Sequence, residues 1–314
     1  MAFKLHPKRD PGREIARVVQ VLLGRTARKL SRLDTPVTER IHCARTACKR
    51  ARAALKLAAS PQKKLFRREN LWLRDTARAL ARARDADAHL TSIDALLKRT
   101  RGPLNRRAVA VAREALATRI QIAGANSPAL EHQLTQATAR LQKSGERLAA
   151  WRPEFDCAAM GRNFGRGYVR ARAAGIAARR EKTAEAFHQW RKATKTCAHQ
   201  SRLLRAAATP MLKKLRANLD QLGKQLGDEH DLTILREQVE KLSRLPRRDP
   251  LEEKGMRTAL GVIDARREAL RTSALALGRR TFARRKRRVM SELKKGWRRA
   301  QDGSARKAGE GEGG

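Results

Sequence analysis

Apolar residues recur along most of the chain at the spacing of one helix face, in segments of roughly 15 to 28 residues. Helix starts are expected where a capping residue precedes a proline, at Thr35-Pro36, Ser60-Pro61, Ser127-Pro128 and Thr209-Pro210. Gly102-Pro103 and residues 246–250 are typical of loops. The pattern predicts about ten helices, no strand and therefore an all-α fold. Residues 303–314 are expected to form a disordered tail.

An internal repeat emerges when the chain is shifted by 146 residues. The coinciding positions are His42 with His188, Arg45 with Arg191, Lys49 with Lys195, Lys56 with Arg202, Leu80 with Leu226, and Asp85 with Asp231. The histidine match carries weight because the chain has only seven histidines. We interpret residues 10–150 and 154–300 as duplicated units, each with enough helix for a bundle. The Ser60-Pro61 and Thr209-Pro210 turns are out of register, so the loops of the two units should differ.

On a helix, each copy of the motif forms one cationic stripe. At ~100° per residue, the charged side chains of the first copy fall within an arc of roughly 80°. These side chains are His42, Arg45, Lys49, Arg52 and Lys56. The second stripe contains His188, Arg191, Lys195 and Arg202, flanked by Lys192 and His199. Like charges at these spacings destabilise a helix unless the face is solvated or binds an anion, and the duplication favours an anion site.

Composition supports a polyanionic partner. The chain carries 73 Lys and Arg against 31 Asp and Glu, a formal net charge of +42. Such a surface attracts nucleic acid, anionic membranes and phosphate polymers. Mixed Arg and Lys suit a polymer of phosphates, since Arg offers a planar fork and Lys a mobile point charge. Only 4% of residues are aromatic, which argues against stacking on single-stranded bases.

Cysteine usage and hydropathy point to the cytoplasm. Cys43, Cys48, Cys157 and Cys197 form no C-x-x-C pair, and no secretory signal is recognised at the start of the sequence. No stretch approaches the ~18 apolar residues of a transmembrane helix, so none is expected.

Two acidic positions and one His-Asp dyad are candidates for chemistry. Asp85 and Asp231 are expected where one helix ends and the next begins, as N-cap acceptors or as partners that orient a basic residue. His230-Asp231 resembles a metal-phosphohydrolase dyad, but the matching position of the first unit is Arg84, which would repel a metal. His42 and Cys43 are neighbours on a helix and point in different directions, so they do not form a nucleophile pair. No metal site and no catalytic residue are expected.

These motifs resemble the CHAD family, the conserved-histidine α-helical domains. The family's first motif, approximately H-x-x-R-x-x-x-(K/R)-R-x-R, is matched by His42, Arg45, Lys49, Arg50 and Arg52. Its later motif and the following L-G-x-x-x-D segment are matched by His188, Arg191, Lys192, Lys195, Leu226, Gly227 and Asp231. The chain departs from the family at Ala198 and His199, where Arg and Tyr are usual. The resemblance covers roughly residues 10 to 300.

The resemblance implies two helical bundles related by pseudo-twofold symmetry, with a basic central cavity between them. It also implies binding of inorganic polyphosphate, often at intracellular granules, without enzymatic activity or a cofactor. Some relatives carry a triphosphatase domain with an E-x-E-x-K signature, and this signature is not found here. The expected polyphosphate-binding residues are His42, Arg45, Lys49, Arg50, Arg52, Lys56, His188, Arg191, Lys192, Lys195 and Arg202, with Asp85 and Asp231 in structural or orienting roles.

Two alternatives stay open at this point. The first is a nucleic-acid-binding protein, since a chain of this charge binds DNA or RNA at low salt. The second is a metal-dependent phosphohydrolase built on His and Asp residues. The basic segment 279–299 is expected to be one helix, read as a solvated face, a further polyanion contact or an interfacial helix. The sequence does not fix the oligomeric state.

Overall fold

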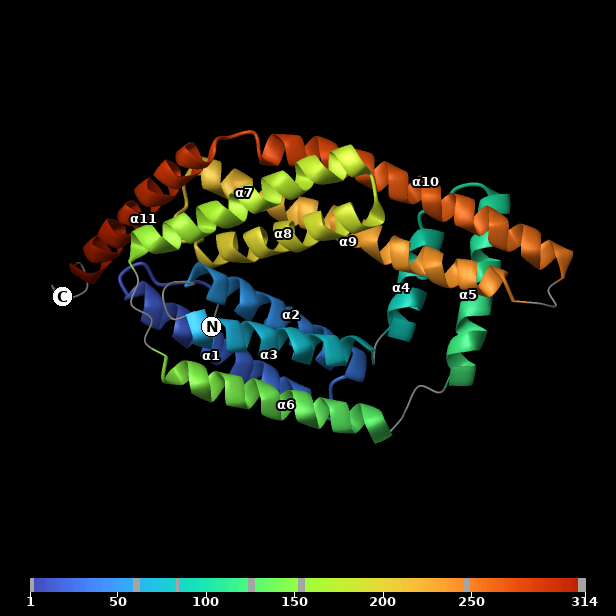
Figure 1. Cartoon of the computed structure of the whole chain (residues 1–314), viewed down its shortest axis with the longest axis horizontal. Coiled ribbons are helices and arrows are strands. Elements are labelled where there is room, and N and C mark those ends of the chain that lie inside the picture. The colour runs from blue at the N-terminus through green and yellow to red at the C-terminus, as the bar shows by residue number, and fades with distance from the viewer. Residues whose placement is uncertain are drawn as a thin grey trace.

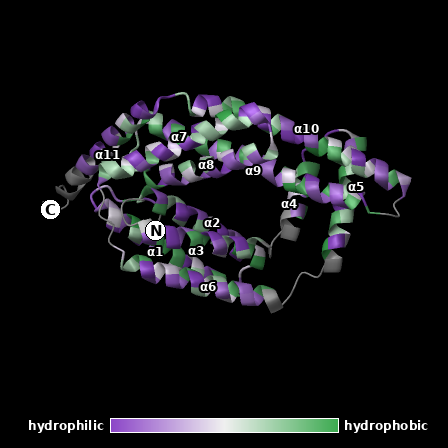
Figure 2. Cartoon of the chain, in the orientation of Figure 1, coloured by the Kyte–Doolittle hydropathy of each residue, from purple (hydrophilic) through white to green (hydrophobic). Residues whose placement is uncertain are grey.

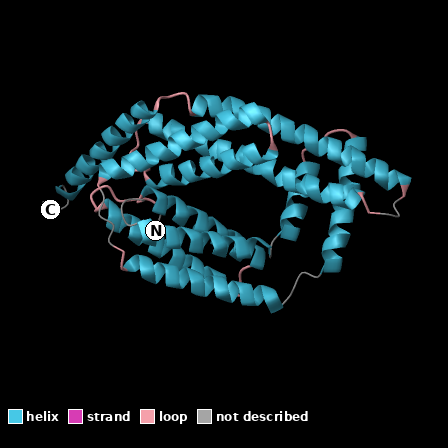
Figure 3. Cartoon of the chain, viewed as in Figure 1, coloured by secondary structure: helices cyan, strands magenta, loops and turns pink. Residues whose placement is uncertain are grey.

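The computed structural model describes residues 3–58, 63–82, 85–123, 128–151, 156–245 and 249–309. In these ranges the chain forms eleven α-helices and no strand, as the hydrophobic pattern predicts (Figures 1 and 3). The helices are α1 (Pro11–Leu30), α2 (Val37–Leu57), α3 (Lys63–Arg82), α4 (Asp85–Leu97), α5 (Pro103–Ala123), α6 (Pro128–Ala149), α7 (Cys157–Glu181), α8 (Ala184–Leu203), α9 (Pro210–Ser243), α10 (Pro250–Thr281) and α11 (Lys286–Gly309). None of the described helices is long and apolar enough to cross a lipid bilayer.

The helix starts follow the expected capping chemistry in part. Thr209 caps α9, because its hydroxyl accepts a hydrogen bond from the backbone N–H of Leu212 and Pro210 begins the helix. At Thr35-Pro36 the N-cap lies one residue later than expected, because Pro36 rather than Thr35 is the N-cap residue. No side chain caps α2. Ser60-Pro61 and Ser127 lie outside the described residues.

The starts of two pairs of helices can be compared with the 146-residue shift between the motifs. Helix α1 begins at Pro11 and α7 at Cys157, 146 residues later, and α2 begins at Val37 and α8 at Ala184, 147 residues later. The second unit differs at one place: α9 runs unbroken from Pro210 to Ser243 where the first unit has the separate helices α3 and α4. Asp231 therefore lies inside a helix, and its expected role as an N-cap is wrong. Asp85 is the first residue of α4, and its side chain lies outside the described part of the structure.

Buried side chains gather into two clusters that both cross the expected division near residue 150. The larger cluster joins α1, α2, α3 and α6 to α7, α8, α11, the first half of α9 and the end of α10. The smaller cluster joins α4 and α5 to the second half of α9 and the first half of α10. With 34 and 32 residues, α9 and α10 extend ~50 Å and reach both clusters (Figure 1). Hydrophobic and hydrophilic residues are interspersed along the described helices (Figure 2).

The basic segment 279–299 is not one helix. Helix α10 ends at Thr281 and α11 begins at Lys286. Val289, Leu293 and Trp297 of α11 are buried in the larger cluster, so this seam is not available to a membrane or granule surface as an interfacial helix would require. Helix α11 continues to Gly309, into the stretch expected to be a tail.

Candidate functional site

Helices α2 and α8, which carry the two cationic stripes, pack against each other in the middle of the molecule (Figure 1). The Gln200 side chain of α8 donates a hydrogen bond to the backbone carbonyl of Ala53 in α2, 3.2 Å away. Residues 146 positions apart in the sequence are thereby brought into one site.

Four basic residues of the two stripes meet at this contact, and we call Arg45, Lys49, Arg191 and Lys195 the central cationic cluster. Lys49 is exposed to solvent, although many protein atoms lie close to its side chain. This desolvation lowers the pKa of Lys49 to about 8, and the positive charges of Arg191, Arg45 and Lys195 add to the effect. Burial and the positive charges of Arg191 and Arg202 lower the pKa of Lys195.

Two glycines of α9 leave room for the basic side chains of α8. A Cβ atom at Gly223 would lie 3.4 Å from Cδ of Lys195, and one at Gly227 would lie 3.9 Å from Nε of Arg191. The glycines are four residues apart, as are Arg191 and Lys195, so each pair occupies one helix face. A larger side chain at either glycine would occupy the space that these basic groups now fill.

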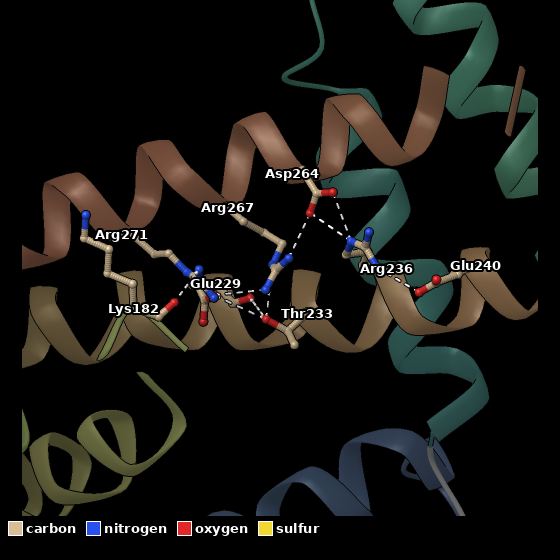
Figure 4. Close-up of polar contacts among 8 residues, drawn as sticks. All are labelled: Lys182, Glu229, Thr233, Arg236, Glu240, Asp264, Arg267 and Arg271. Carbon is tan, nitrogen blue, oxygen red and sulfur yellow. Dashed lines mark hydrogen bonds and ion pairs between the residues drawn. The ribbon is translucent and has the colours of Figure 1, made fainter. Parts of the chain in front are cut away.

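Carboxylates neutralise the arginines that lie between α9 and α10. Glu229, which is buried, lies 2.8 Å from Nε of Arg271 and 3.7 Å from Arg267, while Asp264 pairs with Arg236 and Arg267 (Figure 4). These pairs form a ladder along the two helices.

Three residues of the central cationic cluster, Lys49, Arg191 and Lys195, lack comparable ion pairs among the described residues. None of the three forms an ion pair within 4.0 Å with any carboxylate of the described residues, and Nε of Arg191 is buried without a hydrogen-bond partner among them. Asp231 contributes a weaker attraction, and burial raises the pKa of its carboxyl group. The cluster is therefore a region of concentrated positive charge in the free protein.

Two histidines stack beside the cluster. The rings of His188 in α8 and His230 in α9 lie 4.3 Å apart, with their planes inclined by 32°. Burial and the nearby cations Arg191 and Lys192 lower the pKa of His188, and similar causes lower the pKa of His230 to about 3. His230 is therefore neutral at pH 7. A neutral imidazole can still donate a hydrogen bond to a phosphate oxygen.

His199 and Arg50 extend the site toward the end of α8. His199 is buried, and burial together with Arg202, Arg50 and Lys195 lowers its pKa to about 3. Nδ1 of His199 and Nε of Arg50 are buried without hydrogen-bond partners among the described residues. Arg202, in contrast to Arg50, has a partner, because its guanidinium forms an ion pair with Asp220 at 2.9 Å.

Comparison with known proteins accounts for these motifs. The sequence profile of the CHAD domain family matches residues 16–240 and, in a second match, residues 176–310. The chain belongs to the CHAD domain family. Among solved structures, the crystal structure of the CHAD domain from the plant Ricinus communis superposes with a TM-score of 0.54. That match has 18% identity and covers 89% of this chain and 92% of the plant chain, so it shows a shared fold. No curated protein matches the sequence significantly.

Not every CHAD motif residue reaches the central cationic cluster. Nε of Arg52 donates to the Asn70 side chain of α3 at 3.0 Å, and Arg52 faces the α3 cations rather than those of α8. Lys56 lies near Arg170 of α7. His42 and Lys192 are exposed at the edge of the stripes. The first stripe is divided because α2 packs against α3 and α7 as well as α8.

Sequence reasoning gave too small a role to four residues that complete this CHAD site. From the sequence, His199 only flanks the second stripe and departs from the family pattern, and His230 is only part of a rejected metal dyad. Gly227 is matched only as part of the L-G-x-x-x-D motif, and the repeated Leu-Gly pairs, four residues apart in α9, could have indicated Gly223 as well. Among the described residues, no group of three or more His, Cys, Asp and Glu side chains is placed to hold a metal ion.

Proposed function

We propose that this CHAD protein binds inorganic polyphosphate at the α2–α8 contact and does so without turning it over. The observation that carries the proposal is the meeting of Lys49 with Arg191 and Lys195, where like charges from two distant stripes lie close together and form no ion pair within 4.0 Å with a described carboxylate. Such an arrangement is unfavourable in the free protein, and a bound chain of phosphates would relieve it. Membership of the CHAD family supports the same ligand.

The expected binding residues fall into two groups under this proposal. The central cationic cluster, with Arg50 and His188, would contact phosphate oxygens directly, and Asp231 would orient Arg191. Lys192, Arg202, Arg52, Lys56 and His42 would extend the basic surface along which a longer polymer runs. Association with polyphosphate granules in the cytoplasm would follow from this binding.

The proposal is tested by titration with long-chain polyphosphate near 0.15 M salt. We expect Arg45→Ala/Arg191→Ala to bind about 100-fold more weakly, because each hydrogen bond to a charged group contributes about 1.5 kcal/mol. Arg106→Ala/Arg107→Ala removes the same charge from exposed residues of α5 and should change affinity little. Equal losses in both variants would show that diffuse surface charge carries the binding.

Duplex DNA as competitor separates polyphosphate binding from nucleic-acid binding. We expect DNA to displace polyphosphate poorly at this salt concentration, since its attachment would rest on phosphate contacts to the general surface. Easy displacement by DNA, with both double mutants unchanged, would favour the nucleic-acid alternative. Phosphate release with added divalent metal, lost in Asp231→Asn, would favour the phosphohydrolase alternative.

A further inference from the structure

A cavity of about 250 Å³ lies between α7 and α10 and is lined by none of the residues assigned above to polyphosphate. Its walls are two matching helix faces. Helix α7 contributes residues 172, 175, 176 and 179, and α10 contributes residues 275, 278 and 279, with Phe282 directly after its last turn. Both sets have the i, i+3, i+4, i+7 spacing of one helix face, with a glycine at the second position of each.

Trp190 of α8 is wedged between these glycines. A Cβ atom at Gly175 would lie 2.9 Å from Cε2 of the indole, and one at Gly278 would lie 2.5 Å from Cζ2. The two glycines therefore make room for the ring, which is 1% exposed and forms part of the cavity lining. Its Nε1 has no hydrogen-bond partner among the described residues.

The rest of the lining combines apolar side chains with arginines. Ile176 is 52% exposed and lines the cavity. Arg172, Arg179 and Arg279 are exposed around the cavity, and none of them forms an ion pair or hydrogen bond with a described residue. This differs from the ladder of Figure 4, where the neighbouring Arg267 and Arg271 of α10 are paired.

We propose that this cavity binds a small amphiphilic anion, with one flat apolar group next to Trp190 and a carboxylate, phosphate or sulfonate held by the arginines. Aromatic and aliphatic walls with a few convergent charged groups are the usual composition of small-molecule sites. The volume, just below the usual range for such sites, restricts the apolar part to a compact aromatic group rather than a long acyl chain. Arginine is suited to the anionic part because its planar fork matches these oxyanions.

The test uses 8-anilinonaphthalene-1-sulfonate as the probe, followed by its fluorescence and by energy transfer from tryptophan. The uncharged analogue N-phenyl-1-naphthylamine reports the apolar contribution alone. Arg179→Ala/Arg279→Ala removes charge at the cavity, and Ile176→Asp places a carboxylate in its lining at an exposed position that should not disturb folding. Arg106→Ala/Arg107→Ala, distant on α5, is the matched control for lost charge.

We expect Arg179→Ala/Arg279→Ala to weaken sulfonate binding about tenfold and to leave binding of the uncharged analogue unchanged. Ile176→Asp should abolish the energy transfer from tryptophan to the bound probe. The proposal is overturned if Ile176→Asp binds the probe as the wild type does, or if the α5 control loses as much affinity as the cavity variant. Because no polyphosphate is present, the outcome is independent of the function proposed above.

Discussion

Lys49 illustrates how charge at a single residue follows from its neighbours. Its pKa of about 8 lies below the 10.5 of an ordinary lysine because many protein atoms and three cations lie close to it. Polyphosphate would add negative charge at the same place and raise the pKa of Lys49 again, so binding should take up a proton. The residue thus couples affinity to pH in a range where the histidines with a pKa of about 3 stay neutral.

We therefore predict that long-chain polyphosphate binds more weakly as the pH rises from 7 to 9, by up to about tenfold per pH unit for one linked proton. Lys49→Arg should flatten this profile, because arginine stays protonated throughout. Isothermal titration in buffers of different ionisation enthalpy measures the proton uptake directly. A wild-type profile as flat as that of Lys49→Arg would contradict the linkage.

The lowered pKa of Lys49 also makes the stability of the folded protein depend on pH. The unfolded chain holds the Lys49 proton up to a pH near 10.5, whereas the folded protein releases it near 8. Between these values the unfolded state binds more protons, so this residue makes the free protein more stable as the pH rises from about 8 to about 10.5.

At the scale of elements, glycines decide how closely helices approach. A Cβ atom at Gly296 of α11 would lie 3.1 Å from the backbone Cα of Ala207 and 3.1 Å from Cγ2 of Thr209. This close approach fixes α11 on the loop before α9. Gly261 of α10 is the opposite case, because nothing lies within 4 Å of a Cβ placed there.

We predict opposite signs for the same substitution at these two positions. Gly296→Ala should destabilise the protein by about 1–3 kcal/mol, since the backbone of Ala207 cannot move as a flexible side chain would. Gly261→Ala should stabilise it by up to about 1 kcal/mol, through the higher helix propensity of alanine. Urea unfolding followed by circular dichroism measures both changes, and a loss of stability in Gly261→Ala would contradict the assignment of open space.

At the scale of the whole molecule, the two sequence units are interdependent. The smaller cluster takes Ile93 of α4 and Val109 of α5 from the first unit, and Leu235 of α9 and Ile263 of α10 from the second. The larger cluster joins α2 to α8 in the same way. Separating the units would expose both sets of apolar side chains to water.

Neither residues 10–150 nor residues 154–300 should therefore fold cooperatively alone. Each isolated unit is expected to lack the sharp thermal transition of the full chain, because it loses its partners in both clusters. Mixing the two units should restore part of the transition. Independent cooperative melting of either unit, followed by circular dichroism, would show that it is a domain of its own.

The sequence by itself determined what depends on neighbours a few residues away. Helical spacing of apolar residues gave the all-α class, and the His-x-x-Arg-x-x-x-Lys spacing gave two cationic stripes, because residues three, four and seven apart share a helix face. The tertiary structure alone decided that Lys49 meets Lys195, that Arg52 turns to α3, and that α4 and α5 pack on α9 and α10. Periodicity shows that a face will be covered, but the partner depends on long-range packing and on small residues such as Gly223 and Gly227, whose role appears only once two helices are in contact.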